Sequence, residues 1–139
     1  MKKILEANNL IKKYKDENIL NGVMLDIYQG EFLVIMGSSG SGKTTLLNCL
    51  SGMDKITSGR VSIQGENFES LTDKQASNFR ASKVGFVFQE MNLIDNLSVE
   101  ENILLPSFLK KNRNEVETRN KLSNLLSIID LKHRRNSTP

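Results

Sequence analysis

Gly37-Ser38-Ser39-Gly40-Ser41-Gly42-Lys43-Thr44-Thr45 is the stretch that decides the fold expected of this 139-residue chain. Its spacing, a glycine and four further residues before Gly-Lys-Thr, is that of a phosphate-binding loop. The apolar run at 32–36 predicts a buried strand before the loop, and the pattern at 45–50 predicts a helix after it, which Gly52 can stop. A flexible glycine- and serine-rich linker would have neither flank. The loop indicates a nucleotide but does not say which one.

The chemistry of a triphosphate explains these residue types. Glycines let the backbone turn tightly and approach the phosphates, and the helix that follows adds the positive end of its dipole. We expect Lys43 to bridge the β- and γ-phosphates and the Thr44 hydroxyl to hold Mg²⁺, which prefers hard oxygen ligands. Thr45 lies one step further along the helix, where we expect it to approach the α-phosphate.

Composition indicates one ordinary globular domain, with 25% charged and 38% hydrophobic residues. The net charge of +3 is a mild excess of 19 basic over 16 acidic residues without a dense basic patch, so nucleic acid is not implied as a partner. The single cysteine, Cys49, cannot form an internal disulfide and fits a reducing compartment. Because no apolar run is long enough to span a membrane, a cytoplasmic protein is expected.

The rest of the chain alternates between strand and helix patterns. A polar turn at 15–18 between two strands predicts an antiparallel hairpin, and capping boxes predict helix starts at Thr72 and Ser98. The basic tail at 132–139 is expected to be a solvated loop. In chain order, the expected elements are strands at 4–14, 19–28, 32–36, 60–65 and 84–88, and helices at 45–50, at 73–82, from 98 to a kink or end at Pro106, and from Asn114 with an apolar face of Leu122, Leu125, Leu126 and Ile129.

Two residues outside the loop are candidate site residues. Tyr14 ends the first strand, where an aromatic side chain usually packs on its neighbours and less often serves as a stacking platform for a base. Gln89 follows the strand predicted at 84–88, and ligands of open α/β sheets gather at the carboxyl ends of strands. Gln89 is therefore either a site residue or the first residue of a loop.

Taken together, these motifs resemble the first part of an ABC transporter ATPase subunit. The features that carry the resemblance are the strand with Tyr14 before the loop, the loop itself, Thr57-Ser58-Gly59 before a strand, and Gly85-Phe86-Val87-Phe88-Gln89. The segment 92–106 resembles the branch that includes lipoprotein-release, macrolide-export and antimicrobial-peptide resistance ATPases. The resemblance covers nearly the whole chain.

The resemblance implies a role for each matching residue. Tyr14 matches the aromatic residue that stacks on adenine, and Gly37, Ser38, Ser39, Gly40, Ser41, Gly42, Lys43, Thr44 and Thr45 match the phosphate loop around ATP. Lys43 would contact the terminal phosphates, Thr44 would hold Mg²⁺, and Gln89 would contact Mg²⁺ and the attacking water, which makes Lys43 and Gln89 the catalytic candidates. The segment 90–97 matches the region that faces the membrane partner.

The resemblance also implies a fold and partners. The expected fold is an α/β phosphate-loop NTPase of the ABC ATPase type, with an N-terminal antiparallel β subdomain, cut off before the signature loop of the family. Its expected parts are a hairpin at 1–31, the phosphate-loop core at 32–89 and the start of a helical subdomain at 90–139. Two such subunits would sandwich ATP as a homodimer, held at the inner face of the cell membrane by a transmembrane permease.

Two short stretches imitate missing family motifs. Leu50-Ser51-Gly52 resembles the start of a signature loop, but a helix stop explains it. The stretch 126–130 resembles the acidic strand of the family, but it continues a helical stripe. The signature loop, the acidic strand, the catalytic glutamate and the switch histidine are expected beyond residue 139, and His133 lies too early to be that histidine.

Three functions remain open at this point. The first is the ATP-binding part of a transporter ATPase that powers export or extraction of a peptide-like or lipophilic substrate. The second is a nucleotide-binding module without catalysis. The third, a kinase or GTPase, is disfavoured by the hairpin before the loop, by Tyr14 and by Gln89.

Overall fold

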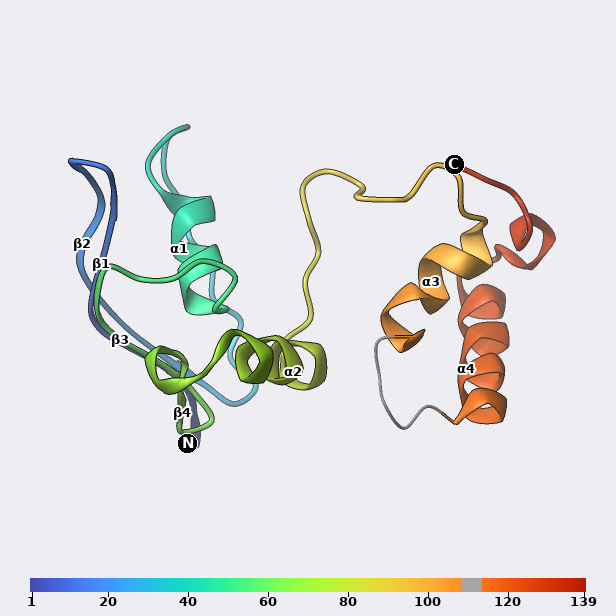
Figure 1. Cartoon of the computed structure of the whole chain (residues 1–139), viewed down its shortest axis with the longest axis horizontal. Coiled ribbons are helices and arrows are strands. Elements are labelled where there is room, and N and C mark those ends of the chain that lie inside the picture. Colours follow the sequence, from blue (N-terminus) through green and yellow to red (C-terminus); the bar gives the residue numbers. More distant parts are fainter. Residues whose placement is uncertain (109–113) are drawn as a thin grey trace. The chain divides into compact units, whose positions relative to one another are not determined.

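The structure of the chain is a computed structural model that describes residues 1–108 and 114–139. It divides into two compact units, Met1–Gly85 and Phe86–Pro139 (Figure 1). Within the described residues, no helix has the length and the apolar character needed to cross a membrane.

The first unit is built on an antiparallel sheet of four strands. These are β1 (Lys3–Tyr14), β2 (Glu17–Tyr28), β3 (Ser58–Ile63) and β4 (Glu66–Asn67), in the spatial order β2-β1-β3-β4. β1 and β2 form the predicted hairpin, in which Tyr14 lies opposite Glu17 and Lys3 opposite Tyr28. β3 confirms the strand predicted at 60–65, although it begins and ends two residues earlier.

The helix predicted after the loop is α1 (Lys43–Leu50), and it packs on this sheet. Its last two residues, Cys49 and Leu50, are buried in a core with Ala7, Leu10, Leu20 and Val61 of the strands. Gly52 ends the helix as predicted: with φ +69° it allows its own N–H to donate to the Cys49 carbonyl and that of Met53 to the Asn48 carbonyl. This pair of hydrogen bonds is the Schellman arrangement.

The two strands predicted at 32–36 and 84–88 are absent, so this expectation was wrong for the chain as it stands. Both segments lie outside helices and strands, and most of their apolar residues are exposed, with Phe32 at 89% and Val87 at 100%. The physical reason is that a strand exists only through hydrogen bonds to a neighbour, and neither segment pairs with another among the described residues. The apolar runs therefore showed that these segments are hydrophobic, but they could not show whether the segments pair with a neighbouring strand.

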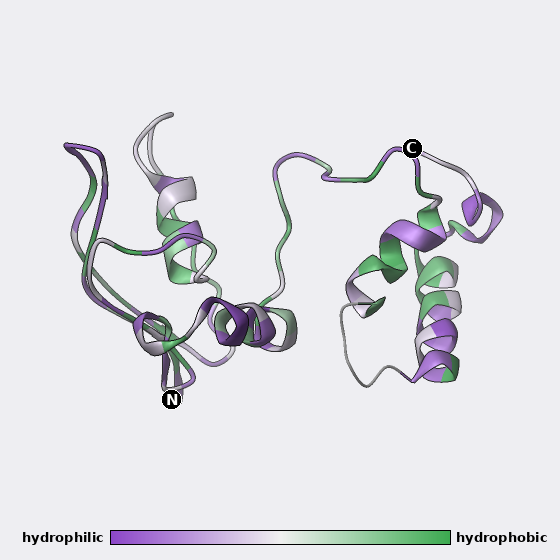
Figure 2. Ribbon diagram, viewed as in Figure 1, coloured by the Kyte–Doolittle hydropathy of each residue, from purple (hydrophilic) through white to green (hydrophobic). Residues whose placement is uncertain are grey.

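A short helical layer completes the first unit. The 3₁₀ turn η1 (Phe68–Ser70) leads to α2 (Asp73–Lys83), and the rings of Phe68 and Phe79 meet edge to face at 5.4 Å. The capping box predicted at Thr72 is confirmed, because its side chain accepts from the Gln75 N–H and Gln75 accepts from the Thr72 N–H. In Figure 2, α2 is largely hydrophilic, in keeping with its exposed surface.

The second unit contains α3 (Val99–Phe108), α4 (Glu115–Ile128) and the 3₁₀ turn η2 (Lys132–Arg134). The capping box at Ser98 is confirmed by two reciprocal hydrogen bonds with Glu101, and Asn114 caps α4 as predicted. Pro106 lies inside α3, which continues to Phe108. On α4, Leu122 and Leu126 are buried, whereas Leu125 and Ile129 are 41% and 44% exposed. Figure 2 shows the apolar residues of α4 concentrated towards its C-terminal half.

The C-terminal segment is bound more tightly than a solvated loop would be. Arg135 forms a two-pronged ion pair with Glu100, with Nε–Oε2 at 2.5 Å and a second guanidinium nitrogen 2.7 Å from Oε1. The backbone N–H groups of Val99 and Glu100 donate to the carbonyls of Ser137 and Arg135. The expectation of a solvated basic run was therefore wrong at Arg135, because the start of α3 offers both a carboxylate and free N–H groups.

Gly59 is the position where the sheet depends most directly on a missing side chain. Its φ is +97°, and a Cβ there would lie 2.2 Å from the Asn9 carbonyl oxygen of β1. Gly65 has a similar φ of +87°, but nothing lies within 4 Å of its Cβ position. We predict that Gly59→Ala lowers the free energy of unfolding by about 2 kcal/mol more than Gly65→Ala, because only the first also displaces backbone. Equal losses in denaturant unfolding would contradict this.

The exposed apolar segment at 32–36 predicts self-association. Unpaired backbone next to Phe32, Val34 and Met36 can add to the same segment of a second copy. We predict that the 139-residue chain associates with rising concentration in sedimentation experiments, and that Val34→Lys reduces the association. A monomer that melts sharply and cooperatively would show that this segment causes no association.

Candidate functional site

The phosphate loop is a tight turn that leads directly into α1. Gly40 and Gly42 adopt left-handed φ values of +78° and +86°, and Gly42 is the N-cap of the helix. A Cβ at Gly42 would also lie 3.3 Å from both Cγ2 and the carbonyl oxygen of Ile19 in β2. Glycine is therefore required at this position both by the turn and by the close approach of the hairpin.

Lys43 folds back over this turn. Its Nζ donates to the carbonyl of Ser38 at 2.6 Å and to the carbonyl of Gly37 at 3.0 Å, and it lies 3.4 Å from the Ser41 hydroxyl. The Lys43 ammonium therefore lies within the loop, and its hydrogen-bond partners are uncharged oxygens. Anionic phosphate oxygens would be stronger partners for this ammonium than the carbonyls are.

The start of α1 supplies further donors. The first N–H groups of a helix have no partner within the helix, and Gly42 offers no side chain to cap them. The helix dipole places partial positive charge at the same point, so backbone and Lys43 together suit an anion. The Thr44 side chain is exposed and Thr45 is partly buried. A hydroxyl at Thr44 is a suitable ligand for Mg²⁺ that is also bound to phosphate.

Tyr14 is held by contacts that the sequence did not reveal. Its hydroxyl donates to Oδ2 of Asp54, while Oδ1 of Asp54 lies 2.7 Å from Nζ of Lys12. The Lys12 ammonium also donates to the Lys55 carbonyl at 2.7 Å and lies over the Tyr14 ring, 4.6 Å from its centre. The Tyr14 residue is 48% exposed. Tyr14 is therefore neither a packed core residue nor a free side chain.

Both charged partners of Tyr14 stay ionised at neutral pH. Burial lowers the pKa of Lys12, but the hydrogen bond and the negative charge of Asp54 outweigh it, so that pKa lies above its ordinary value. Burial likewise raises the pKa of Asp54, and the hydrogen bonds from Lys12 and Tyr14 outweigh it and bring that pKa below its ordinary value. Lys12 and Asp54 thus form an ion pair, and the Tyr14 hydroxyl is hydrogen-bonded to its carboxylate.

Gln89 belongs to the second unit, in the irregular segment before α3, and its side chain is exposed. The Asn102 side chain of α3 forms several hydrogen bonds with the backbone of that segment. Its amide accepts from the Ile94 N–H at 2.8 Å and donates to the carbonyls of Ile94, Leu97 and Ser98 at 3.0 to 3.1 Å. The role of Gln89 towards Mg²⁺ and Thr44 stays a prediction.

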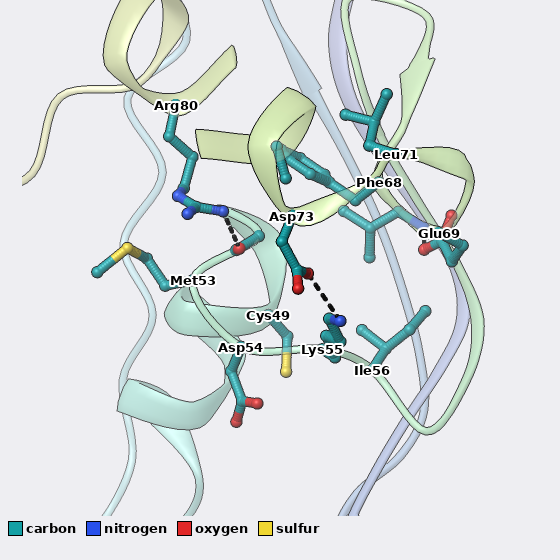
Figure 3. Close-up of a pocket in the computed structure, with 13 residues that line it drawn as sticks. Cys49, Met53, Asp54, Lys55, Ile56, Phe68, Glu69, Leu71, Asp73 and Arg80 are labelled. Atoms are coloured by element: carbon teal, nitrogen blue, oxygen red, sulfur yellow. Dashed lines mark hydrogen bonds and ion pairs between the residues drawn. The ribbon is translucent and has the colours of Figure 1, made fainter. Parts of the chain in front are cut away.

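A separate cavity of about 410 Å³ lies in the first unit, away from the phosphate loop (Figure 3). Its rim carries two polar contacts, the ion pair between Lys55 and Asp73 at 2.8 Å and the hydrogen bond from Arg80 to the Gly52 carbonyl at 2.8 Å. None of the predicted site residues lines it. The residues that do are Cys49, Gly52, Met53, Asp54, Lys55, Ile56, Val61, Phe68, Glu69, Leu71, Asp73, Ala76 and Arg80.

Sequence reasoning missed Lys12 and Asp54. One signal was present: residues two apart on a strand share a face, so Lys12 lies on the same face as the buried Leu10 and as Tyr14. A lysine on a buried face needs a carboxylate partner. The identity of that partner, 42 positions further along the chain, could not be read from any local pattern.

Comparison with known proteins places these features in a family. The ABC transporter family matches residues 20–139. The bacitracin export ATP-binding protein BceA of Halalkalibacterium halodurans is 47% identical over 112 residues, which are 78% of this chain and 44% of that protein. The lipoprotein-releasing system ATP-binding protein LolD of Cytophaga hutchinsonii is 39% identical over 134 residues, which are 96% of this chain and 61% of that protein.

A solved structure agrees with the sequence relatives. The ATP-binding cassette MJ0796, a dimer in a post-hydrolysis state bound to ADP and phosphate, is similar to this chain with a TM-score of 0.86 and 37% sequence identity. The match covers 98% of this chain and 62% of the cassette. The chain thus spans about half the length of the curated relatives it matches, with 44% and 61% for BceA and LolD.

The family match, the relatives and the solved cassette all indicate the same family. This chain therefore belongs to the ABC transporter ATP-binding family, and its fold is that of an α/β phosphate-loop NTPase with an antiparallel sheet at its N-terminal side.

Proposed function

We propose that this chain is the ATP-binding part of a transporter ATPase that drives export or extraction of a peptide-like or lipophilic substrate. The observation that carries the proposal is the loop geometry, in which Lys43 lies against the Gly37 and Ser38 carbonyls ahead of the uncapped start of α1. The substrate class is supported by the names of the relatives BceA and LolD, which refer to bacitracin export and lipoprotein release.

In this proposal each loop residue has one task. The loop N–H groups and the first turn of α1 bind the phosphate oxygens, and Lys43 leaves its carbonyl partners to neutralise charge on the β- and γ-phosphates. The Thr44 hydroxyl and the Gln89 amide oxygen would hold Mg²⁺, and Gln89 would also orient the attacking water. Bound Mg²⁺ would neutralise charge that develops on the transferred phosphoryl group. Tyr14 stacks on the base.

The assembly follows from the same proposal. A second ATPase subunit completes each site in a homodimer, in line with the dimeric cassette MJ0796. A transmembrane permease holds the pair at the inner face of the membrane, and the segment 90–97 contacts it. The partition into a hairpin at 1–31, a core at 32–89 and the start of a helical subdomain at 90–139 stays part of this proposal.

The second candidate function is a nucleotide-binding module without catalysis, and under the first we propose that the 139 residues alone hydrolyse ATP negligibly. The observation that favours it is that, among the residues that the structure describes, Lys43 contacts two carbonyl oxygens and a hydroxyl and forms no ion pair with a carboxylate. Hydrolysis of ATP requires an oriented water as well as charge neutralisation.

Lys43→Ala tests the phosphate site. Removing one ammonium from the phosphates costs about 1.5–3 kcal/mol, so we predict that ATP affinity measured by calorimetry falls about tenfold or more. Lys74→Ala is the matched control, since it removes an equal charge from the exposed face of α2. Equal affinities of the two variants would refute the site. Phosphate release that depends on both Lys43 and Mg²⁺ in the purified chain would instead overturn the proposed inactivity.

A further inference from the structure

The Asp54 carboxylate joins two residues of β1 to the end of α1. One oxygen lies 2.7 Å from the Lys12 ammonium, and the other accepts the Tyr14 hydroxyl. Lys12 and Tyr14 are two residues apart, so they lie on the same face of the strand. One carboxylate therefore restrains both side chains at once.

The carboxylate is itself fixed by the helix that starts at the phosphate loop. The N–H groups of Met53 and Asp54 both donate to the Asn48 carbonyl, at 2.8 and 3.1 Å. Asn48 is in the last turn of α1, whose first residue is Lys43. Eight helical residues span about 12 Å, so Tyr14 and the phosphate loop are held at opposite ends of one short rigid element.

Lys12 has little freedom to choose another partner. Its residue exposure is 7%, and both oxygens near its Nζ, from Asp54 and from the Lys55 carbonyl, are at 2.7 Å. A buried ammonium that loses its carboxylate is strongly unfavourable. The ammonium in turn occupies one face of the Tyr14 ring, 4.6 Å from its centre, which leaves the opposite face for a flat ligand.

We propose that Lys12 and Asp54 are positioning residues that fix the Tyr14 ring as the base platform of the nucleotide site. The inference rests on the proposed function, because it assumes that a nucleotide occupies the loop. It adds that base recognition depends on a partly buried ion pair that touches neither the base nor the phosphates. Loss of the ion pair leaves the Tyr14 ring without a fixed position. Nucleotide binding then weakens because contacts with the base are lost, while contacts with the phosphates remain.

The test compares two ligands that differ in the base. ATP uses both the loop and the platform, whereas inorganic tripolyphosphate uses the loop only. We expect Asp54→Asn to weaken ATP binding about three- to tenfold, the loss typical of one hydrogen bond, and to leave tripolyphosphate binding unchanged. Asp73→Asn is the matched control, because it removes an equal charge from an ion pair with 86% exposed side chains. It should change neither affinity.

Tyr14→Phe is a second variant that tests the same contact in case Asp54→Asn weakens ATP binding only because the protein misfolds. It keeps the ring and removes only the hydroxyl that Asp54 holds, so its loss in ATP affinity should resemble that of Asp54→Asn. The double variant should lose little more than either single variant, since both changes break the same contact. Fully additive losses would mean that the two residues act separately, and would overturn the inference.

A spectroscopic titration provides a readout apart from binding. The chain has two tyrosines and no tryptophan, so Tyr28→Phe leaves tyrosinate absorbance to report on Tyr14 alone. The hydrogen bond to Asp54 raises the pKa of Tyr14, with burial and the charge of Asp54 adding to it, the charge of Lys12 opposing it, and Cys49 contributing a small further rise. Asp54→Asn should therefore move this titration to lower pH. An unmoved titration would show that the hydroxyl is not held, and would overturn the inference.

The outcomes separate this inference from the proposed function. If Lys43→Ala weakens both ligands while Asp54→Asn and Tyr14→Phe bind ATP normally, the nucleotide site stands and the positioning role is refuted. If the unsubstituted chain binds neither ATP nor tripolyphosphate, the proposed function fails and the inference fails with it. Selective loss of ATP binding in both variants supports the positioning role.

Discussion

The burial of the C-terminal end of α1 against the antiparallel sheet is the contact on which the first unit depends. Cys49 and Leu50 enter the core formed by Ala7, Leu10, Leu20 and Val61, and that packing fixes the direction of the helix. The start of the same helix carries Lys43 and the glycine turn, and its end fixes Asp54. The apolar burial of α1 therefore places the phosphate loop, and it also places Asp54, which holds Tyr14.

Many of the turns and helix ends could be predicted from the sequence because they depend on neighbouring residues. The glycine turn, the stop at Gly52 and the caps at Thr72, Ser98 and Asn114 each need only residues within one turn, and each was predicted correctly. The segments at 32–36 and 84–88 were not, because a strand needs a hydrogen-bonding neighbour that no local pattern supplies. Their apolar character is real, and it remains exposed here.

In the site, too, contacts between residues close in sequence could be predicted and contacts between distant residues could not. The glycine turn before α1 could be predicted because it depends only on residues that are close together in the sequence. The contacts of Lys12 and Arg135 could not, since their carboxylate partners, Asp54 and Glu100, lie 42 and 35 positions away. In both cases a basic residue forms an ion pair with a carboxylate near a helix end.

The central claim is that the nucleotide binds at the glycine loop ahead of α1 and not in the cavity beside α2. Backbone amide shifts of the labelled chain, followed by NMR during addition of magnesium ATP, test this directly. The claim predicts that the largest shifts occur at residues 38–44, with smaller ones around Tyr14. Unmoved loop amides together with shifts at Met53, Phe68 and Arg80, which line the cavity, would contradict it.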